Sequence, residues 1–444
     1  MPYPFPTHSG IARFVVCGLA LGVSLMAARC EPYTFGTYIG SATNAGSADG
    51  TNGTAQFISP TGLARDSLGT LYVTDGNAVR SIALLGTNRV VHTLAGTIGS
   101  HAFADGTNGA AQFNYPQGVA VDAGGSLYVA DTYNNAIRKV TAVGTNWVVT
   151  TIAGPAPPAN PFGTQDGTNN VARFHNPYGI AVDSLTNVFV ADSLNQTIRK
   201  ITLVGTNWVV TTVAGRAGSA GSDNGSNDVA RFSSPASVAV ASLGTLYVVD
   251  LANNNVRKLS QIGTNWAVST FAGFAGVTGS TDASGTNASF NMPQCVGVDT
   301  AGNVYVTDSG NHTVRKINPG GSVTTIGGAV GIPGAADGTG TAASFNLPYG
   351  IVADPSGVLY VADYLGYAIR QGQLALLRYS ISAKTLVLSW PSSLTGFLPE
   401  TTSHLGGVWN PVPGSQIVLS GQTFYVTNSV GSGAGLYRLH HPAP

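Results

Sequence analysis

Charged residues are scarce in this sequence. They make up 9% of its 444 residues, and 20 lysines and arginines balance 20 aspartates and glutamates. Recognition of nucleic acid requires a clustered basic surface, because each phosphate contact needs a nearby cation. Half of the basic residues here recur at regular intervals along the chain instead of forming a cluster. We therefore expect no nucleic-acid partner.

Glutamate and cysteine are scarcer still. The two glutamates, Glu31 and Glu400, flank the repeated region described below, so a general acid–base pair would have to come from aspartates that recur within it. Of the three cysteines, Cys17 and Cys30 lie near the N-terminus, and Cys295 alone stands in the repeats. We expect no internal disulfide and interpret Cys295 as a small buried residue.

One long apolar run occurs near the N-terminus. Residues 14–28 form a 15-residue apolar stretch that follows Arg13 and precedes small residues. A membrane-spanning helix needs about 20 apolar residues, whereas this pattern is typical of a secretory signal. We interpret residues 1–30 as a signal peptide and expect a mature chain without a membrane span, in a periplasm, on a cell surface or secreted. A retained anchor is the alternative.

A unit of 55 to 61 residues recurs six times. Each copy has a phenylalanine, an aspartate 18 positions later and, in five copies, an arginine seven positions after that. The first copy is two residues shorter in this last interval and reaches its arginine, Arg80, after five positions. The phenylalanines are Phe57, Phe113, Phe174, Phe232, Phe290 and Phe345, and the aspartates are Asp75, Asp131, Asp192, Asp250, Asp308 and Asp363.

Each copy has the pattern of four short strands. In residues 113–154, GVAVD and SLYVAD are separated by turn residues 123–125, and AIRKVT and WVVTTIAG by residues 144–146. The strands are rich in Val, Ile, Tyr and Thr and are apolar on both faces, as in sheets that pack between other sheets. Six such sheets, none of which can bury its faces alone, predict an all-β fold, a six-bladed β-propeller.

The two ends of the repeated region indicate how the ring closes. The sixth copy lacks a counterpart of the fourth strand, while Tyr33–Gly40 precedes the first copy as an isolated strand. We expect this N-terminal strand to complete the sixth sheet, because that pairing removes both open edges. The propeller is predicted to span residues 31–373.

The sequence DGTNGAAQFNYPQGVAVDAGGSLYVADTYNNAIRK at residues 105–139 resembles the NHL repeat, and the resemblance covers about residues 33–373. It implies a six-bladed propeller that usually serves as a binding or interaction scaffold. A minority of related propellers are zinc lyases, with several histidines at the channel, or lactonase-like hydrolases with a glutamate in their metal site. This ring has no glutamate, and a single histidine, His175, stands at the predicted channel mouth.

Two sets of aspartates recur with the repeat and are interpreted as structural. The aspartate that ends each second strand is expected to bond the arginine of the third strand, because an active site is made once and this pair recurs. The loop before each phenylalanine carries an aspartate that is expected to start a turn by bonding its own downstream backbone. Calcium binding is the alternative, although the dense acidic spacing of a calcium loop is absent. The loop aspartates are Asp49, Asp105, Asp166, Asp223, Asp282 and Asp337.

Two positions in each copy are expected to face the mouth of the central channel. They are the residue after the repeated phenylalanine and the residue after the proline that follows, where the innermost strand begins. Together they predict a polar, partly aromatic collar, and both ligand contact and the capping of loops with channel water remain open as interpretations. The ligand-binding candidates are Asn114, Gln117, His175, Tyr178, Ser233, Asn291, Gln294, Asn346 and Tyr349.

Residues 374–444 lose the repeat and consist of short apparent strands, which predict a small C-terminal β-sandwich-like domain. For the whole chain we expect an exported, monomeric, non-enzymatic propeller that binds a protein or carbohydrate partner through its loop-rich face, without a cofactor. The alternative is a metal-dependent lyase or hydrolase with zinc or calcium at the mouth of the channel.

Overall fold

The computed structural model describes residues 33–155 and 161–374. Beyond these it describes residues 378–382, 385–391, 398–402, 410–412, 417–420, 423–429 and 436–440. The predicted signal peptide, residues 1–30, lies outside the described residues. Within the described residues, no helix has both the length and the apolar character needed to cross a bilayer. Phe35–Gly372 form one compact unit, and the C-terminal strands belong to another.

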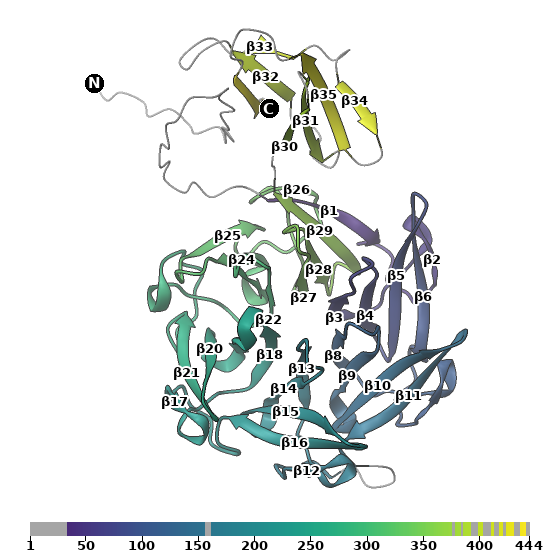
Figure 1. Cartoon of the computed structure of the whole chain (residues 1–444), viewed down its shortest axis with the longest axis vertical. Coiled ribbons are helices and arrows are strands. Elements are labelled where there is room, and N and C mark those ends of the chain that lie inside the picture. The colour runs from purple at the N-terminus through teal and green to yellow at the C-terminus, as the bar shows by residue number, and fades with distance from the viewer. Residues whose placement is uncertain are drawn as a thin grey trace. The chain divides into compact units, whose positions relative to one another are not determined.

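Six antiparallel sheets surround a central channel (Figure 1), which confirms the predicted propeller. The innermost strands contact one another in the order β3, β8, β13, β18, β22, β27, and β27 in turn contacts β3, so the ring is closed. We number the blades 1 to 6 in this order. From the innermost strand outward, blade 1 comprises β3 (Pro60–Arg65), β4 (Leu71–Asp75), β5 (Ala78–Leu85), β6 (Asn88–Gly96) and β2 (Gly50–Thr51). Blade 2 comprises β8 (Pro116–Val121), β9 (Leu127–Asp131), β10 (Ala136–Val143), β11 (Asn146–Ala153) and β7 (Gly106–Thr107).

The other four blades follow the same plan. Blade 3 comprises β13 (Pro177–Val182), β14 (Val188–Asp192), β15 (Thr197–Val204), β16 (Asn207–Ala214) and β12 (Gly167–Thr168). Blade 4 comprises β18 (Pro235–Val240), β19 (Leu246–Asp250), β20 (Asn255–Ile262), β21 (Asn265–Ala272) and β17 (Gly225–Ser226). Blade 5 comprises β22 (Pro293–Val298), β23 (Val304–Asp308), β24 (Thr313–Ile317) and β25 (Val323–Gly327). Blade 6 comprises β27 (Pro348–Ala353), β28 (Leu359–Asp363), β29 (Ala368–Leu374), β1 (Tyr33–Gly40) and β26 (Gly338–Thr339).

The predicted count of four strands per blade needs a correction, because five of the six sheets have a fifth strand. In blade 2 this strand is β7, which pairs with the outer strand β11. It lies in the loop that was interpreted as an acidic turn, and the short 3-10 helix η2 (Asn108–Ala110) follows it. The loop therefore covers the edge of the blade that it precedes, an edge that would otherwise expose unpaired backbone groups.

The N-terminal strand β1 closes the ring as predicted. It lies between β29 and β26 in the sheet of blade 6. Phe35 anchors it, because its ring is fully buried and meets Phe345 edge to face at 5.0 Å between ring centroids. Gly327 and Gly372 flank this ring, and a Cβ on either would lie 2.3 Å from a Phe35 carbon. Blades 5 and 6 thus leave room for this aromatic ring by having no side chain at either position.

The repeated aspartate and arginine form the ion pair that the sequence predicted. In blade 2, Arg138 Nη1 donates to Asp131 Oδ2 at 2.6 Å, and both side chains are fully buried. Arg138 also reaches the loop aspartate, with Nη2 2.7 Å from Asp105 Oδ1. The pair of second-strand aspartate and third-strand arginine recurs in every blade. This network is therefore part of the scaffold.

The role of the loop aspartate differs from the prediction. Asp105 accepts hydrogen bonds from the N–H and Oγ1 of Thr151 on β11, at 3.0 and 2.9 Å, so it clamps the loop to the outer strand and does not start a local turn. In blade 4 the equivalent residue is Asn224 and not Asp223, because Arg257 Nη2 donates to Asn224 Oδ1 at 2.9 Å. Blade 4 therefore has one carboxylate fewer in its network.

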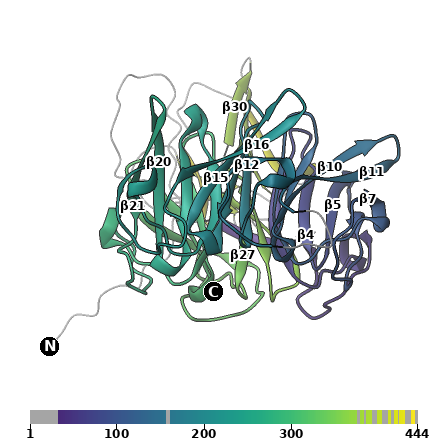
Figure 2. The same ribbon diagram turned by 90° about the horizontal axis from the view of Figure 1, so that it is seen from below.

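The repeated phenylalanines pack between neighbouring blades. Phe113 is fully buried and belongs to one hydrophobic cluster with Tyr72 and Val79 of blade 1 and with Val119 and Val129 of blade 2. Burial of such a side chain contributes on the order of 1.5–3 kcal/mol. Seen edge-on, the strands cross the thickness of the ring, so their connections gather on its two flat faces (Figure 2).

The described residues of the C-terminal unit form two small antiparallel sheets. One has the strand order β30, β31, β35, β34, and the other has β33, β32, β36. Their bounds are β30 (Arg378–Ser382), β31 (Thr385–Pro391), β32 (Leu398–Thr402), β33 (Asn410–Pro411), β34 (Ile417–Ser420), β35 (Thr423–Ser429) and β36 (Leu436–His440). Its all-β character agrees with the pattern of short strands in the sequence.

Candidate functional site

One flat face of the ring carries the long connections. The loops before each innermost strand and the tips between second and third strands lie there, and backbone hydrogen bonds join them, such as Tyr133 N–H to the Asn114 carbonyl at 3.1 Å. The tips in blades 2 to 5 are short 3-10 helices: η3 (Thr132–Asn134), η5 (Ser193–Asn195), η8 (Leu251–Asn253) and η10 (Ser309–Asn311). We call this the loop-rich face.

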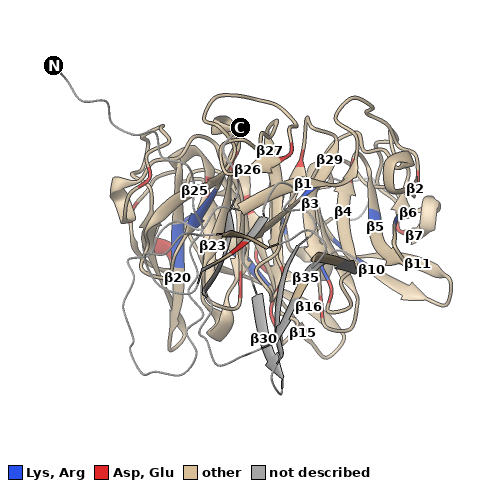
Figure 3. Cartoon of the chain, turned by 90° about the horizontal axis from the view of Figure 1, so that it is seen from above, with Lys and Arg blue, Asp and Glu red and all other residues tan. Residues whose placement is uncertain are grey.

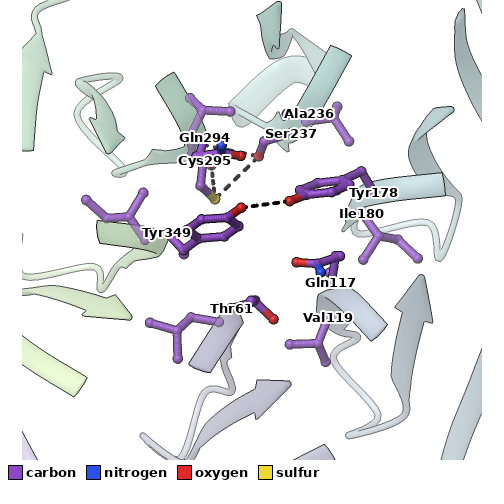
Figure 4. Close-up of a pocket in the computed structure, with 18 residues that line it drawn as sticks. Thr61, Gln117, Val119, Tyr178, Ile180, Ala236, Ser237, Gln294, Cys295 and Tyr349 are labelled. Atoms are coloured by element: carbon purple, nitrogen blue, oxygen red, sulfur yellow. Dashed lines mark hydrogen bonds between the residues drawn. The ribbon is translucent and has the colours of Figure 1, made fainter. Parts of the chain in front are cut away.

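A pocket occupies the channel where the innermost strands begin (Figure 4). All six residues that follow the repeated prolines line it: Thr61, Gln117, Tyr178, Ala236, Gln294 and Tyr349. The cavity has a volume of about 70 Å³, counted as the space that the centres of water molecules can occupy. Since one water needs about 10–15 Å³ of such space, the pocket has room for several waters or for one end of a small ligand.

In four blades the close approach of neighbouring innermost strands depends on a glycine at the next position along the strand. A Cβ at Gly62, Gly118, Gly179 or Gly350 would lie 2.1 to 2.6 Å from backbone atoms of the next blade. Blades 4 and 5 have Ser237 and Cys295 at this position, with 3.4 Å from Ser237 Oγ to Cys295 Sγ. At this one position the strands therefore present polar side chains in blades 4 and 5 and only backbone in the other four blades.

Gly118→Ala should destabilise the ring by about 1–3 kcal/mol, because its methyl group would overlap the Tyr178 carbonyl oxygen of the next blade. Urea denaturation measures the effect. Cys295→Ala changes the equivalent position of blade 5, where a side chain already fits, and should cost less. Equal losses for the two variants would show that the close approach of the strands does not depend on glycine.

Two phenols and two amides are the largest polar groups of the pocket, which the hydroxyls of Thr61 and Ser237 and the thiol of Cys295 also line. Tyr178 Oη donates to Tyr349 Oη at 3.2 Å, which joins blade 3 to blade 6 across the channel. Burial raises the pKa of Tyr178 well above its ordinary value, and the neighbouring phenols of Tyr349, Tyr133 and Tyr364 add to the effect. The Tyr178 phenol is therefore a neutral hydrogen-bonding group at physiological pH.

The amide oxygens of Gln117 and Gln294 are buried and have no hydrogen-bond partner among the described residues. Gln294 is 8% exposed, and its amide belongs to the pocket lining. The Gln117 side chain points into the channel in Figure 4. An unsatisfied buried acceptor is costly, so each of these oxygens has capacity for a donor that enters the channel.

The structure separates the predicted collar into two sets. Gln117, Tyr178, Gln294 and Tyr349 line the pocket, as expected for a collar at the channel. The other candidates lie outside the lining, and their backbone N–H groups instead donate to the Oδ1 of the repeated aspartate at 2.6 to 2.8 Å. These half-buried residues are Asn114, His175, Ser233, Asn291 and Asn346.

A left-handed residue causes this separation. Tyr115, Asn176, Ser234, Met292 and Leu347 each stand between a repeated phenylalanine and proline, and their φ angles are +48° to +55°. This conformation turns the chain before the innermost strand begins. The residue before it therefore faces the loops, whereas the residue after the proline faces the channel.

The titratable residues near the channel do not form a metal centre. The imidazole of His175 stacks on Phe162, with 4.2 Å between ring centroids, and burial lowers the pKa of His175. Cys295 lines the pocket, is half-buried where full burial was expected, and has a thiol pKa that burial raises. Among the residues that the structure describes, no three His, Cys, Asp or Glu side chains are close enough together to hold a metal ion.

Three tyrosines on the loop-rich face, Tyr115, Tyr133 and Tyr364, were not predicted from the sequence, and Tyr364 packs on the predicted Tyr349. Tyr115 and Tyr133 of blade 2 have ring centroids 5.0 Å apart, and Tyr349 and Tyr364 of blade 6 have centroids 4.9 Å apart. Burial raises the pKa of Tyr364, and the phenols of Tyr349, Tyr115, Tyr367 and Tyr133 contribute to it, in this order. Tyr115, Tyr133 and Tyr364 stand at tip and loop positions where the copies differ, a signal that comparing the copies at these positions would have shown.

Two family models match parts of the chain that belong mainly to the ring. The family model of the teneurin NHL domain matches residues 30–260, and that of the NHL repeat matches residues 290–317. Among curated proteins, SUPPRESSOR OF QUENCHING 1 of Arabidopsis thaliana is 29% identical over 62% of this chain and 26% of its own length. NHL repeat-containing protein 2 of Gallus gallus is 26% identical over 68% of this chain and 44% of its own length. The chain thus spans less than half the length of each of these relatives.

Solved structures share the fold. A Bacteroides thetaiotaomicron protein of unknown function is similar at a TM-score of 0.58 and 22% identity, over 77% of this chain and 76% of that one. An auxiliary nutrient binding protein from Bacteroides ovatus is similar at a TM-score of 0.58 and 17% identity, over 78% of this chain and 77% of that one. At these identities the likeness shows a common fold.

Proposed function

Because the chain belongs to the NHL-repeat family, we propose that it is a non-enzymatic binding propeller whose ligand site is the channel mouth on the loop-rich face. The observation that carries this proposal is the location of the residues in which the copies differ. Tyr178 and Tyr349, the unpartnered amide oxygens and the tyrosines of blades 2 and 6 gather around a single pocket. A pocket with apolar walls and a few convergent polar groups is the usual form of a binding site.

The residues that recur in every blade also support this proposal, because they are not available for catalysis. The repeated aspartates and arginines are bound to each other, so they are occupied as scaffold. The titratable side chains in the pocket lining are two tyrosines and one cysteine, and burial raises the pKa of Tyr178 and of Cys295. This set favours binding without a metal over lyase or hydrolase chemistry.

We further propose that the chain acts outside the cytoplasm and that it is a monomer. The apolar run at residues 14–28 supports the proposed location. Bacteroides propellers of this fold are described as auxiliary nutrient binding proteins, so capture of an external ligand is one use of such a ring. Lys and Arg lie in several parts of the ring (Figure 3), and the repeated arginines are each paired with an aspartate, which supports a partner other than nucleic acid.

Binding to arrays of glycans and of purified extracellular proteins, in the presence of a chelator, tests the proposed function. We expect the wild-type protein to bind, and the Tyr178→Ala/Tyr349→Ala variant to lose binding while its thermal unfolding remains cooperative. Leu68→Ala is the matched control, because Leu68 is 91% exposed in the turn at the opposite end of blade 1. Binding that survives the double substitution, or turnover that a chelator abolishes, would contradict the proposal.

A further inference from the structure

The tip of blade 1, which connects its second and third strands, is shorter than the other tips. Its second strand ends at Asp75 and its third begins at Ala78, so only Gly76 and Asn77 connect them. In blade 2 the corresponding connection has a full 3-10 helix, η3, and Asn135. The two-residue deletion seen in the first repeat therefore leaves a tip of only two residues between blades 6 and 2 on the loop-rich face.

The tyrosines of blade 2 stand beside this short tip, and a tyrosine of blade 6 interacts with them electrostatically. The phenols of Tyr115 and Tyr133 of blade 2 act electrostatically on Tyr364 of blade 6, although blade 1 stands between the two blades. Tyr115 is 43% exposed and Tyr133 is 50% exposed. Asn77 of the short tip holds one side of the group, because its Oδ1 accepts the Tyr115 N–H at 2.8 Å and its Nδ2 lies 3.2 Å from Nδ1 of His101, which stacks on Tyr115.

This aromatic surface continues into the channel. Tyr364 packs on Tyr349, and Tyr349 is bonded to Tyr178 in the lining of the pocket that also contains the two glutamines. A ligand on the tyrosines would therefore reach the Gln117 and Gln294 oxygens with one end. Those oxygens require hydrogen-bond donors, since an amide oxygen is an acceptor only.

The charge of this sector points to a neutral ligand. The aspartates of its three loops, Asp49, Asp105 and Asp337, are each bound to a buried arginine at 2.7 to 2.9 Å. No Lys, Arg, Asp or Glu lines the pocket. An ionic ligand would find no opposite charge there, and the cost of removing it from water would not be offset.

We propose that this site binds a neutral saccharide, with one pyranose face on the tyrosines over blade 1 and a hydroxyl-bearing end donating to Gln117 and Gln294 in the channel. A sugar ring combines an apolar C–H face with many hydroxyl donors, which matches aromatic rings that border unsatisfied acceptors. The proposal rests on the proposed function and specifies the ligand class for that same site. A protein partner is the alternative that the experiment distinguishes.

Calorimetric titration tests the proposal, with neutral hexose and pentose oligosaccharides and the uronic-acid counterpart of the tightest one as probes. The neutral probe should bind, and its uronate should bind more weakly. Gln294→Met and Gln117→Met keep the size of the side chain but remove the acceptor, and each should weaken binding about tenfold, as loss of a well-placed hydrogen bond does. Without ligand, Gln294→Met should melt no lower than wild type, because an unpaired acceptor has been removed.

A second pair of variants tests the tyrosines. Tyr133→Ala should weaken binding by about tenfold and Tyr133→Phe much less, since stacking needs the ring, while Leu68→Ala should leave affinity unchanged. The neutral probe should also protect Cys295, which lines the pocket, from iodoacetamide.

Three results would overturn the saccharide proposal: no neutral saccharide binds, the uronate binds more tightly, or Gln294→Met and Tyr133→Ala both bind normally. If saccharides fail but an extracellular protein binds and the Tyr178→Ala/Tyr349→Ala variant loses it, the ligand class is wrong and the proposed function stands. If neither kind of ligand responds to that variant, both proposals fall.

Discussion

Replacing Arg138 with methionine should destabilise the ring by about 3–5 kcal/mol, because it leaves a buried carboxylate without its partner. Arg138 is fully buried and binds Asp131 at 2.6 Å and Asp105 at 2.7 Å. It also donates to the Gln112 and Ala104 carbonyl oxygens, at 3.1 and 2.7 Å. One guanidinium thus ties the second strand, the third strand and the preceding loop of a blade together.

The loss of stability in Arg138→Met should depend on pH. Burial already raises the pKa of Asp131 to about 6, against the lowering effect of Arg138 and of its hydrogen bonds. Without Arg138 the folded-state pKa rises further above the unfolded value. A raised carboxyl pKa stabilises the fold below the unfolded pKa, and this contribution is lost as pH rises through the folded pKa. Arg138→Met should therefore be least stable above neutral pH and recover as the pH falls toward 5.

Urea denaturation at several pH values measures this effect. Lys139→Met is the matched control, because Lys139 is the next residue on β10 and is only half-buried beside Tyr128. It should cost about 1 kcal/mol or less. Combining Arg138→Met with Asp131→Asn should cost less than the sum of the single changes, since the second change removes the stranded charge. Additive losses without pH dependence would contradict the assigned ion pair.

The second large effect is expected at the closing strand. Phe35→Ala should destabilise the ring by about 3–5 kcal/mol, because a fully buried aromatic ring is replaced by a cavity. The two glycines that flank the ring have no side chains to fill the space, and Phe345 loses its edge-to-face partner. A weakened β1 would also expose the edge of β29 to solvent.

Denaturation combined with limited proteolysis measures both consequences. Thr37→Ala is the matched control, because Thr37 is exposed on the same strand and its backbone N–H keeps the 2.9 Å bond to Asp337. It should change stability by less than about 1 kcal/mol. Wild-type stability of Phe35→Ala, with no faster cleavage near residue 40, would show that β1 does not hold the ring closed.

The ring could be predicted because its key residues recur. Phe113, Asp131 and Arg138 occupy the same environment as their counterparts in every copy, so their spacing reveals a common packing. Closure followed from Tyr33–Gly40 because one strand was missing at one end of the repeats and one was surplus at the other. The edge strands such as Gly106–Thr107 were missed because two residues are too few to show a period.

The site was only partly predictable, for physical reasons. Gln117 and Tyr178 were placed correctly because the preceding proline fixes where the innermost strand begins. His175 and Asn114 were misplaced because the left-handed residue that follows each of them turns the chain. The electrostatic interaction of Tyr364 with Tyr115 depends on the closed ring, which brings the two ends of the repeated region near each other.

The location of a bound ligand tests the central claim most directly. A crystal structure of the protein with the neutral saccharide of highest affinity should show a sugar ring on the tyrosines over blade 1. A hydroxyl should lie within hydrogen-bond distance of the Gln117 or Gln294 oxygen. A sugar bound to the outer strands, to the opposite face or to the C-terminal sheets would contradict this account of the site.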